Sequence, residues 1–391
     1  MFRYHVHSTE FEDAVKKIAI AIPAANKKGA GDCVQLSLYK TVGNSSKSIG
    51  IFLGFNGKIE AISTMEINDV EADEEQLNIY VSGSKLLAAA SAFGAIDTVL
   101  EITLDKEMCI SGAGSKVSLP LGEETSKINP NEAMFIETEL EADKFVRFLD
   151  FGASCYQDGK GAHGMNCVGI RFSHQEKKLS VASSNGSRAV YAEVSDVVIK
   201  KKEGEEKESS DITVTVEGNL LKSAIRNLAG KSKLTISTNG KRLVLKKGTY
   251  VIIILTSEQA FPFEAVLQIT NRNDTKGTWK APMDKILQAL SIYEITMETP
   301  WLEITKKNDS QMSFQGKDEL TTASVTCAQQ NEVGRIVIDE KQFKDSINIF
   351  SVRYGKNADI YIGVSDEEKP LSIRKNLNDS DCIIILPIVS K

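Results

Sequence analysis

The chain repeats one structural unit, and this repetition constrains the fold more than any single motif does. Its clearest copy, residues 211–262, reads as a strand, a helix, a hairpin and a further strand. Val214 and Val216 alternate with polar residues as in a half-buried strand, and the apolar residues that follow, as far as Leu228, lie on one face of a helix stopped by Gly230. We therefore expect one helix to lie across one antiparallel sheet in this unit.

The same unit occurs twice more. The further copies occupy residues 76–121 and 334–387, and the helix starts are about 135 and about 122 residues apart, which is a domain-sized period. A weaker half-copy precedes each unit, so the sequence predicts six helices in three domains, each built of two similar halves. The predicted fold class is α+β, with three tandem domains of βαβββ-like halves and helices on one face of antiparallel sheets. The predicted domains are residues 1–129, 130–268 and 269–391.

The composition is ordinary for a soluble globular protein. Hydrophobic residues make up 41% and charged residues 26% of the chain, and no apolar run approaches the roughly 20 residues of a membrane span. The first residues show no signal-peptide pattern, so we expect a cytoplasmic protein that does not contact a membrane. The net charge of −6 argues against a simple basic DNA-binding domain. A ring can nevertheless be acidic outside and basic along its lumen.

The metal-binding residue types are too scattered to predict a metal site or a cofactor. His5 and His7 share one face of the first predicted strand, but His163 and His174 lie far from them in the sequence. The six cysteines form no CxxC pair, and several lie in apolar strands. We expect reduced thiols of the core at these positions, which are Cys33, Cys109, Cys155, Cys167, Cys327 and Cys382.

Two glycine-rich segments, residues 27–32 and 111–116, do not have the spacing of a phosphate-binding P-loop. The second lies between two predicted strands, whereas a P-loop joins a strand to a helix. We therefore predict a hairpin turn there, as at Asn239-Gly240. No other catalytic motif is present, so the sequence favours a binding protein or scaffold over an enzyme. The charged run at residues 200–210 is interpreted as a solvated loop.

Every predicted helix carries at least one cationic side chain. Lys222 and Arg226 are four residues apart and are predicted to share a helix face. On any single helix, such a cationic side chain could simply lie on an ordinary solvated face. Because cationic side chains recur on all six predicted helices, we favour a surface that faces a phosphate backbone. The candidate DNA-facing residues are Lys16, Lys17, Lys27, Lys28, Lys85, Lys144, Arg147, Lys222, Arg226, Lys285, Lys341 and Lys344.

Three segments resemble a known family in the order of the chain. They are residues 179–194 (LSVASSNGSRAVYAEV), Phe261-Pro262 and residues 383–391 (IIILPIVSK). With the threefold repeat, they make the chain similar to the bacterial DNA polymerase III beta subunit, the sliding clamp, over essentially its whole length. The chain resembles a divergent member, because the family's usual residues are replaced at Asn185, Ser187, Ala189, Phe263 and Glu264 and the terminal arginine is absent.

This resemblance implies a non-enzymatic ring of two chains joined head to tail. The ring would encircle double-stranded DNA without reading its sequence, would be placed there by a clamp loader, and would tether a DNA polymerase and other replication or repair proteins. The alternative is a scaffold with the clamp fold that binds partner peptides but is not loaded on DNA as a closed ring. The dimer interface implied by the resemblance contains Val117 and Leu119 on one side and Ile292 and Tyr293 on the other.

The resemblance also implies a pocket for a short apolar peptide of the partner proteins. Its residues would be Cys167, Ser184, Gly186, Arg188, Ala189, Pro262, Val266, Ile385, Leu386, Pro387 and Ile388. Ala189 and Val389 replace larger or charged family residues, which predicts a pocket of altered shape. The alternative for residues 386–388 is that they merely end the last core strand.

Overall fold

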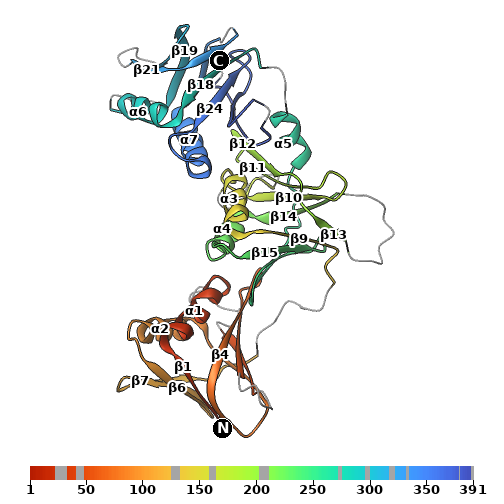
Figure 1. Cartoon of the computed structure of the whole chain (residues 1–391), viewed down its shortest axis with the longest axis vertical. Helices are drawn as coiled ribbons and strands as arrows, with labels where there is room; N and C mark the ends of the chain where they lie inside the picture. Colours follow the sequence, from red (N-terminus) through yellow and green to blue (C-terminus); the bar gives the residue numbers. More distant parts are fainter. Residues whose placement is uncertain are drawn as a thin grey trace. The chain divides into compact units, whose positions relative to one another are not determined.

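In a computed structural model, the described residues form seven α-helices and three sheets (Figure 1). The structure describes the chain except residues 23–32, 41–47, 125–132, 158–163, 202–210, 272–274, 296–299, 317–321, 332–333, 378 and 389–391. The chain divides into two compact units. Unit one comprises Met1–Ala142, Lys200–Glu205 and Arg226–Thr256, and unit two comprises Asp143–Ile199, Glu206–Ile225 and Ser257–Lys391.

All six predicted helices are present. They are α1 (Ser8–Ile18), α2 (Gly83–Gly94), α3 (Ala142–Gly152), α4 (Gly218–Ile225), α6 (Met283–Tyr293) and α7 (Glu340–Tyr354), and a 3-10 turn, Ala19–Ala21, follows α1. The predicted end of α4 was wrong, because the helix stops at Ile225 and residues 226–228 form a turn. The structure adds α5 (Phe263–Thr270), which lies just beyond the repeated unit, residues 211–262, and was therefore not predicted from the repeat.

Unit one is built on a thirteen-stranded sheet. Its strands run in the order β13-β9-β15-β16-β17-β4-β1-β6-β7-β8, and β3, β2 and β5 branch from β4. The strands are β1 (Phe2–His7), β2 (Cys33–Tyr39), β3 (Ser48–Phe55), β4 (Ile59–Ala72), β5 (Gln76–Ser82), β6 (Val99–Leu104), β7 (Glu107–Gly112), β8 (Ser115–Pro120), β9 (Ile136–Glu141), β13 (Ile199–Lys201), β15 (Lys233–Thr238), β16 (Arg242–Lys247) and β17 (Tyr250–Leu255). Both predicted hairpin turns are confirmed. Gly114 lies between β7 and β8 with a φ of +79°, and Gly240 lies between β15 and β16 with a φ of +83°.

The helices of unit one pack on each other and on the sheet (Figure 1). Phe11, Val15 and Ile18 of α1 are fully buried on one helix face, and the Phe11 ring meets that of Phe52 on β3 edge to face, with 5.9 Å between centroids. The approach of α1 to α2 needs a glycine, since a Cβ on Gly94 would lie 2.3 Å from the carboxyl group of Glu12.

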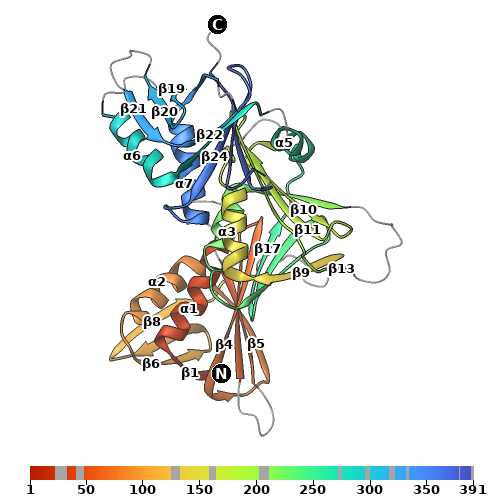
Figure 2. The same ribbon diagram turned by 45° about the horizontal axis from the view of Figure 1, so that its top comes forward.

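Unit two contains a nine-stranded sheet and a four-stranded sheet. The larger sheet has the order β14-β10-β11-β12-β26-β25-β24-β18-β22, and the smaller has the order β21-β20-β19-β23. The strands are β10 (Cys167–Ser173), β11 (Lys178–Ser184), β12 (Arg188–Val194), β14 (Ile212–Glu217), β18 (Gly277–Pro282), β19 (Trp301–Asn308), β20 (Gln311–Gln315), β21 (Thr322–Thr326), β22 (Ala328–Gln330), β23 (Ile336–Asp339), β24 (Asp359–Val364), β25 (Leu371–Arg374) and β26 (Cys382–Ile385). Figure 2 shows α7 and α5 on opposite sides of the larger sheet.

A buried carboxyl group lies where α7 begins. Glu340 is only 2% exposed, and its Oε1 atom has no hydrogen-bond partner within the described part of the chain. Burial, with a contribution from the neighbouring Glu294 carboxylate at the end of α6, raises the pKa of Glu340 to about 7, and Lys344 opposes the shift. Glu340 therefore takes up a proton on folding at pH values between its ordinary pKa of 4.5 and about 7.

We predict that the protein loses stability as the pH rises through this window. The folded state binds more protons than the unfolded state there, so the free energy of unfolding falls as pH increases. Glu340→Gln should remove much of this dependence and raise the free energy of unfolding at pH 8 by on the order of 2 kcal/mol. Urea unfolding from pH 5 to pH 8 measures both effects. The exposed Glu367→Gln is the control, and a Glu340→Gln profile parallel to that of the parent would contradict the prediction.

Candidate functional site

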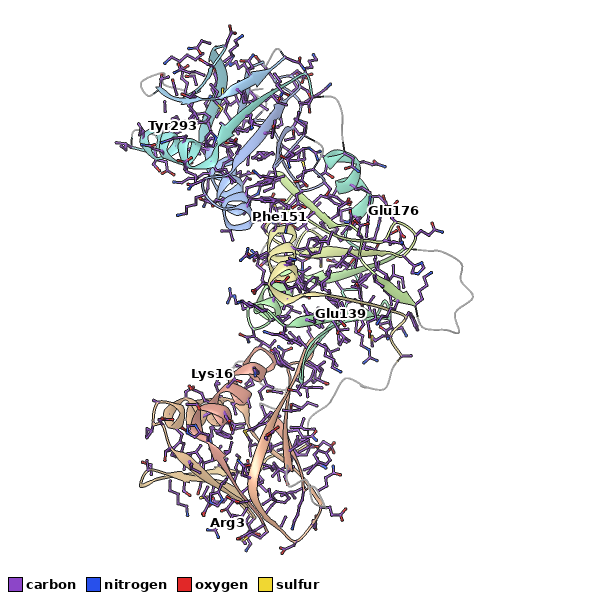
Figure 3. All side chains as sticks on the ribbon, in the orientation of Figure 1. Arg3, Lys16, Glu139, Phe151, Glu176 and Tyr293 are labelled. Atoms are coloured by element: carbon purple, nitrogen blue, oxygen red, sulfur yellow. The ribbon has the colours of Figure 1, made fainter. Side chains whose placement is uncertain are left out.

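Three of the candidate DNA-facing residues of unit one lie on its two helices. Lys16 and Lys17, near the end of α1, form ion pairs of 2.5 Å with Glu12 and Asp13, one helical turn earlier (Figure 3). Lys85 is exposed on α2, and Arg226 is exposed in the turn after α4. Lys27 and Lys28 fall outside the described residues.

In unit two, the cations of α3, α4 and α7 surround one small cavity. This cavity, called here the helix-face cavity, has a volume of about 210 Å³ and is lined among others by Arg147, Asp150, Phe151, Lys222, Val352 and Arg353. The Lys222 Nζ atom lies 5.5 Å from the ring centroid of Tyr156. Phe151, labelled in Figure 3, packs edge to face on Phe350 of α7 with 5.1 Å between centroids. Arg147 and Lys144 are both exposed on α3.

The remaining candidates of unit two are partly neutralised by carboxylates. Lys344 of α7 contacts the Glu294 carboxylate, and the Lys285 Nζ atom lies 3.9 Å from that of Asp284 on α6. Lys341 is exposed in the first turn of α7. The predicted sharing of one helix face by Lys222 and Arg226 was wrong, because α4 ends between them.

The face of the nine-stranded sheet that α5 covers carries the other candidate site. Small residues on β10, β11 and β12 leave room for aromatic rings, because a Cβ on Gly169 would lie 2.7 Å from both Phe261 and Phe263. These two rings form one apolar cluster with Ala182, Ala189, Tyr191 and Val266, and Leu267 packs against it. We call the surface beside this cluster the α5-face groove. Its composition explains why alanine stands at position 189, since a larger side chain would compete with α5 for space.

The pleat of β12 separates two residues that the sequence placed in one pocket. Ala189 is part of the α5-side cluster, so the side chain of the preceding Arg188 projects from the opposite face. There its Nε atom donates to the Cys155 Sγ atom at 3.1 Å, and its Nη1 atom donates to the Gln342 carbonyl oxygen at 3.2 Å. Arg188 therefore links β12 to α7 and is 8% exposed.

The same alternation divides the C-terminal strand. Ile385 pairs with Arg188 and is fully buried with it on the helix side, whereas Ile384 pairs with Ala189 and faces α5. Sequence reasoning missed Ile384, because a run of three isoleucines at residues 383–385 has no alternation from which a face can be assigned. The pairing register between β26 and β12 is needed to assign each isoleucine to a face of the sheet.

The other pocket candidates lie on several elements of unit two, and Ile388 lies at the four-stranded sheet, where its N–H donates to the Val337 carbonyl oxygen of β23 at 2.8 Å. Ser184 pairs with Ala189, Cys167 begins β10 two residues before Gly169, and Pro262 precedes the first turn of α5. Gly186, with φ of +90°, forms the turn between β11 and β12. Strand β26 ends at Ile385, so residues 386–388 lie beyond the core strand. Leu386 is 42% exposed and its N–H donates to the Ser187 carbonyl oxygen at 2.9 Å, and Pro387 and Ile388 are half-buried.

The proposed interface residues differ in what they expose. Val117 is half-buried and Leu119 is buried on β8, which is the last strand along its sheet path. In unit two, Ile292 is 52% exposed and Tyr293 is buried at the end of α6. Ile292 lines a groove of about 820 Å³ between α6 and β21, with Ala289, Ala323 and Val325 among its other apolar residues.

The described residues offer no metal centre. They contain no group of three or more histidine, cysteine, aspartate or glutamate side chains that could hold an ion, and the six cysteines are free thiols. His5 and His7 each lie near a carboxylate, with His7 Nε2 3.3 Å from an Asp97 oxygen, while His163 is outside the described part. Within the described ranges, no helix has the length and apolar character needed to cross a membrane.

The fold corresponds to solved sliding clamps. No family model and no curated protein matches the sequence. A DNA polymerase sliding clamp from Pseudomonas aeruginosa superimposes with a TM-score of 0.83 at 11% identity and with complete coverage of both chains. The Helicobacter pylori beta clamp bound to a DNA ligase peptide gives 0.80 at 13%, covering 99% of this chain and 100% of that one. The beta subunit of DNA polymerase III from Thermotoga maritima gives 0.79 at 14%, with both chains fully covered.

The chain therefore has the sliding-clamp fold from end to end, and the predicted α+β class is confirmed. At this level of identity the likeness is one of architecture. The roles of individual residues must be argued from the geometry of this chain.

Proposed function

We propose that the chain is one subunit of a ring-shaped sliding clamp, which holds a replicative DNA polymerase and other replication or repair proteins on duplex DNA. The observation that carries this proposal is the match to solved clamps over the whole length of both chains. The predicted domains, 1–129, 130–268 and 269–391, would each supply two of the helices that line the ring. The protein would be cytoplasmic and non-enzymatic.

Electrostatic attraction would hold the DNA. Exposed Arg147 on α3, with Lys222 at the helix-face cavity, presents positive charge on a protein whose net charge is −6. Cations that contact phosphates without reading bases give sequence-independent binding, which permits sliding. The carboxylate partners of Lys16, Lys17 and Lys344 weaken this field. They are the observation that favours the second candidate, a clamp-fold scaffold that binds partners but is not loaded on DNA.

Two chains would close the ring head to tail. A strand edge is completed by another strand edge, and the chain has β8 at the end of one sheet and β21, beside the α6 groove, at the end of another. Each chain would offer β8 to the α6 groove of its partner, so the two contacts would be equivalent by two-fold symmetry. Placement of a closed ring on DNA would require a clamp loader.

The α5-face groove would receive the partner proteins. Its exposed Leu386 comes two residues after Ile384, which pairs with Ala189 of the apolar cluster, and a short apolar peptide gains affinity by burying a few such anchors. The H. pylori clamp of the same fold was solved with a DNA ligase peptide. Because Ala189 and Phe263 shape this groove, the peptides of other clamps would bind weakly and the cognate peptide well.

We predict that charge reversal at the helix-face cavity weakens DNA binding. Arg147→Glu combined with Lys222→Glu should lower affinity for duplex DNA and reduce the slope of log affinity against log salt by about 1.8, which is about 0.9 for each lost phosphate contact. Fluorescence anisotropy from low to moderate salt measures both. Lys246→Glu with Lys307→Glu, exposed on strands β16 and β19, alters the net charge equally and should leave the slope unchanged. If the two double variants have equal slopes of log affinity against log salt, the residues of the helix-face cavity do not contact DNA.

We predict that Ile292→Lys gives a folded monomer. The substitution adds a cation to the α6 groove, which already contains Lys280 and Lys285 and whose Asp359 carboxylate already pairs with Lys280 at 3.3 Å, so burying the new charge in a closed interface would be unfavourable. Light scattering after size exclusion reports the mass, and retention on circular but not linear DNA reports ring closure. Val198→Lys is a control at a similarly exposed site, 72% against 52%. An Ile292→Lys protein that remains a dimer and is retained on circles would show that the joint lies elsewhere.

We predict that Leu386→Asp abolishes partner-peptide binding without dissociating the dimer. Loss of one buried anchor should cost about 2 kcal/mol or more, which is at least about 30-fold in affinity. Calorimetry with an apolar peptide selected on the parent protein provides the measurement. Leu377→Asp is a matched control, since the two leucines are 45% and 42% exposed. Parental affinity in the Leu386→Asp variant would exclude the α5-face groove.

A further inference from the structure

The strand that forms one wall of the α5-face groove is short and is held at both ends. Strand β26 pairs with β12 from Arg188↔Ile385 to Tyr191↔Cys382. Beyond one end, the Leu386 N–H donates to the Ser187 carbonyl oxygen. Beyond the other, the side chain of Asp381 continues the ladder, because its Oδ1 atom accepts the Glu193 N–H at 3.3 Å. Asp381 thus takes the place of a backbone acceptor.

The Asp381 carboxylate is fixed by two side chains of α7. Its Oδ2 atom accepts hydrogen bonds from the Arg353 Nε atom and from the Tyr354 hydroxyl group. Asp381 is 2% exposed, and the Arg353 side chain is 15% exposed. Breaking a buried ion pair by removing one charge leaves the other desolvated and unpaired, so each partner constrains the other strongly.

Aromatic rings hold the guanidinium group of Arg353 in place. Its central carbon lies 5.1 Å from the ring centroid of Phe151, 5.4 Å from that of Tyr354 and 6.0 Å from that of Phe148. Phe148 and Phe151 belong to α3, so this one side chain contacts two helices and the residue before β26. Arg353 also lines the helix-face cavity. The contact therefore joins the helices to Asp381, the residue that immediately precedes the strand carrying Ile384.

We infer that Arg353 and Asp381 are a positioning pair for the α5-face groove, which hold β26 against β12 from the helix side of the sheet so that Ile384 stays packed toward α5 and the exposed Leu386 is presented to a partner peptide. The inference rests on the proposed partner binding at this groove. Neither residue contacts the peptide. Their effect is exerted through the register and rigidity of β26, which preorganise the apolar wall and spare the peptide the cost of ordering it.

Two single variants and their combination test the pair. Asp381→Asn keeps the shape and the acceptor for the Glu193 N–H but removes the charge, and Arg353→Met removes the guanidinium group. Each should weaken binding of the selected apolar peptide about tenfold, with the Leu386 contact itself intact. The double variant should lose no more than either single one, because the two residues act as one unit. Additive losses, or parental affinity in both single variants, would overturn the pairing.

A second measurement requires no peptide. Amide hydrogen exchange at Glu193 and Leu386 reports the two ends of β26 directly, and both should exchange faster in Asp381→Asn. The control is Phe314→Leu, which loosens the buried contact between Phe314 of the four-stranded sheet and Phe343 near the start of α7, at the opposite end of that helix from Arg353, where the ring centroids are 6.1 Å apart. It should lower the unfolding temperature while leaving exchange at Glu193 and peptide affinity unchanged. If Phe314→Leu and Asp381→Asn increase amide hydrogen exchange at Glu193 equally, the pair contributes only to overall stability and the inference is overturned.

A milder variant keeps the test decisive if the charged pair proves essential for folding. Tyr354→Phe removes one hydrogen bond to Asp381 and leaves both charges. It should raise the rate of amide hydrogen exchange at Glu193 and lower the affinity for the peptide two- to threefold. Unchanged values in this variant would contradict the inference. If no apolar peptide can be selected on the parent protein, the proposed partner binding is contradicted. If instead amide hydrogen exchange at Glu193 is unchanged in all variants, only the positioning role of the pair is contradicted.

Discussion

The pairing of β12 with β26 is the interaction on which unit two depends. It joins a strand from the middle of the sequence to the last described strand, and so makes one nine-stranded sheet from segments far apart in the chain. Because a pleated strand presents alternate residues to opposite faces, this one register decides two surfaces at once. It sends Arg188 and Ile385 toward the helices and Ala189 and Ile384 toward α5. A slip by one residue would exchange the two sets.

The repeat made the fold predictable from the sequence. A helical period between alternating runs is a local signal, so the six helices and the hairpins at Gly114 and Gly240 could be located without tertiary information. Helix α5 could not, because it lies just beyond the repeated unit and its apolar residues, such as Phe263 and Val266, are explained by the small residues beneath them. The premature end of α4 was likewise invisible, since Leu228 keeps the helical spacing and is buried although it lies in a turn.

The candidate partner site stays a prediction, although the structure brings part of it together. The sequence indicated that the C-terminal segment packs beside the middle of the chain, and there the Leu386 N–H donates to the Ser187 carbonyl oxygen, whereas the Ile388 N–H donates to that of Val337 in the four-stranded sheet. It could not assign faces within three consecutive isoleucines, nor show that Arg188 turns away to contact Cys155. The Arg353–Asp381 pair could not be predicted from the sequence, because neither residue stands in a recognisable motif and their contact depends on how α7 packs.

The net charge of a helix face could not be predicted from the sequence either. A count of lysines does not reveal that Glu12 and Asp13 neutralise Lys16 and Lys17.

The edge strand β8 has a consequence for the folded chain by itself. An open strand edge can recruit any extended chain, including another β8, and such pairing propagates into aggregates. Here Lys116 and Pro120 are exposed on that strand, so one position carries a charge that repels a second copy and another lacks the N–H needed to continue a ladder. The folded chain is therefore protected against indiscriminate strand exchange, and only a surface that tolerates both residues can complete the edge.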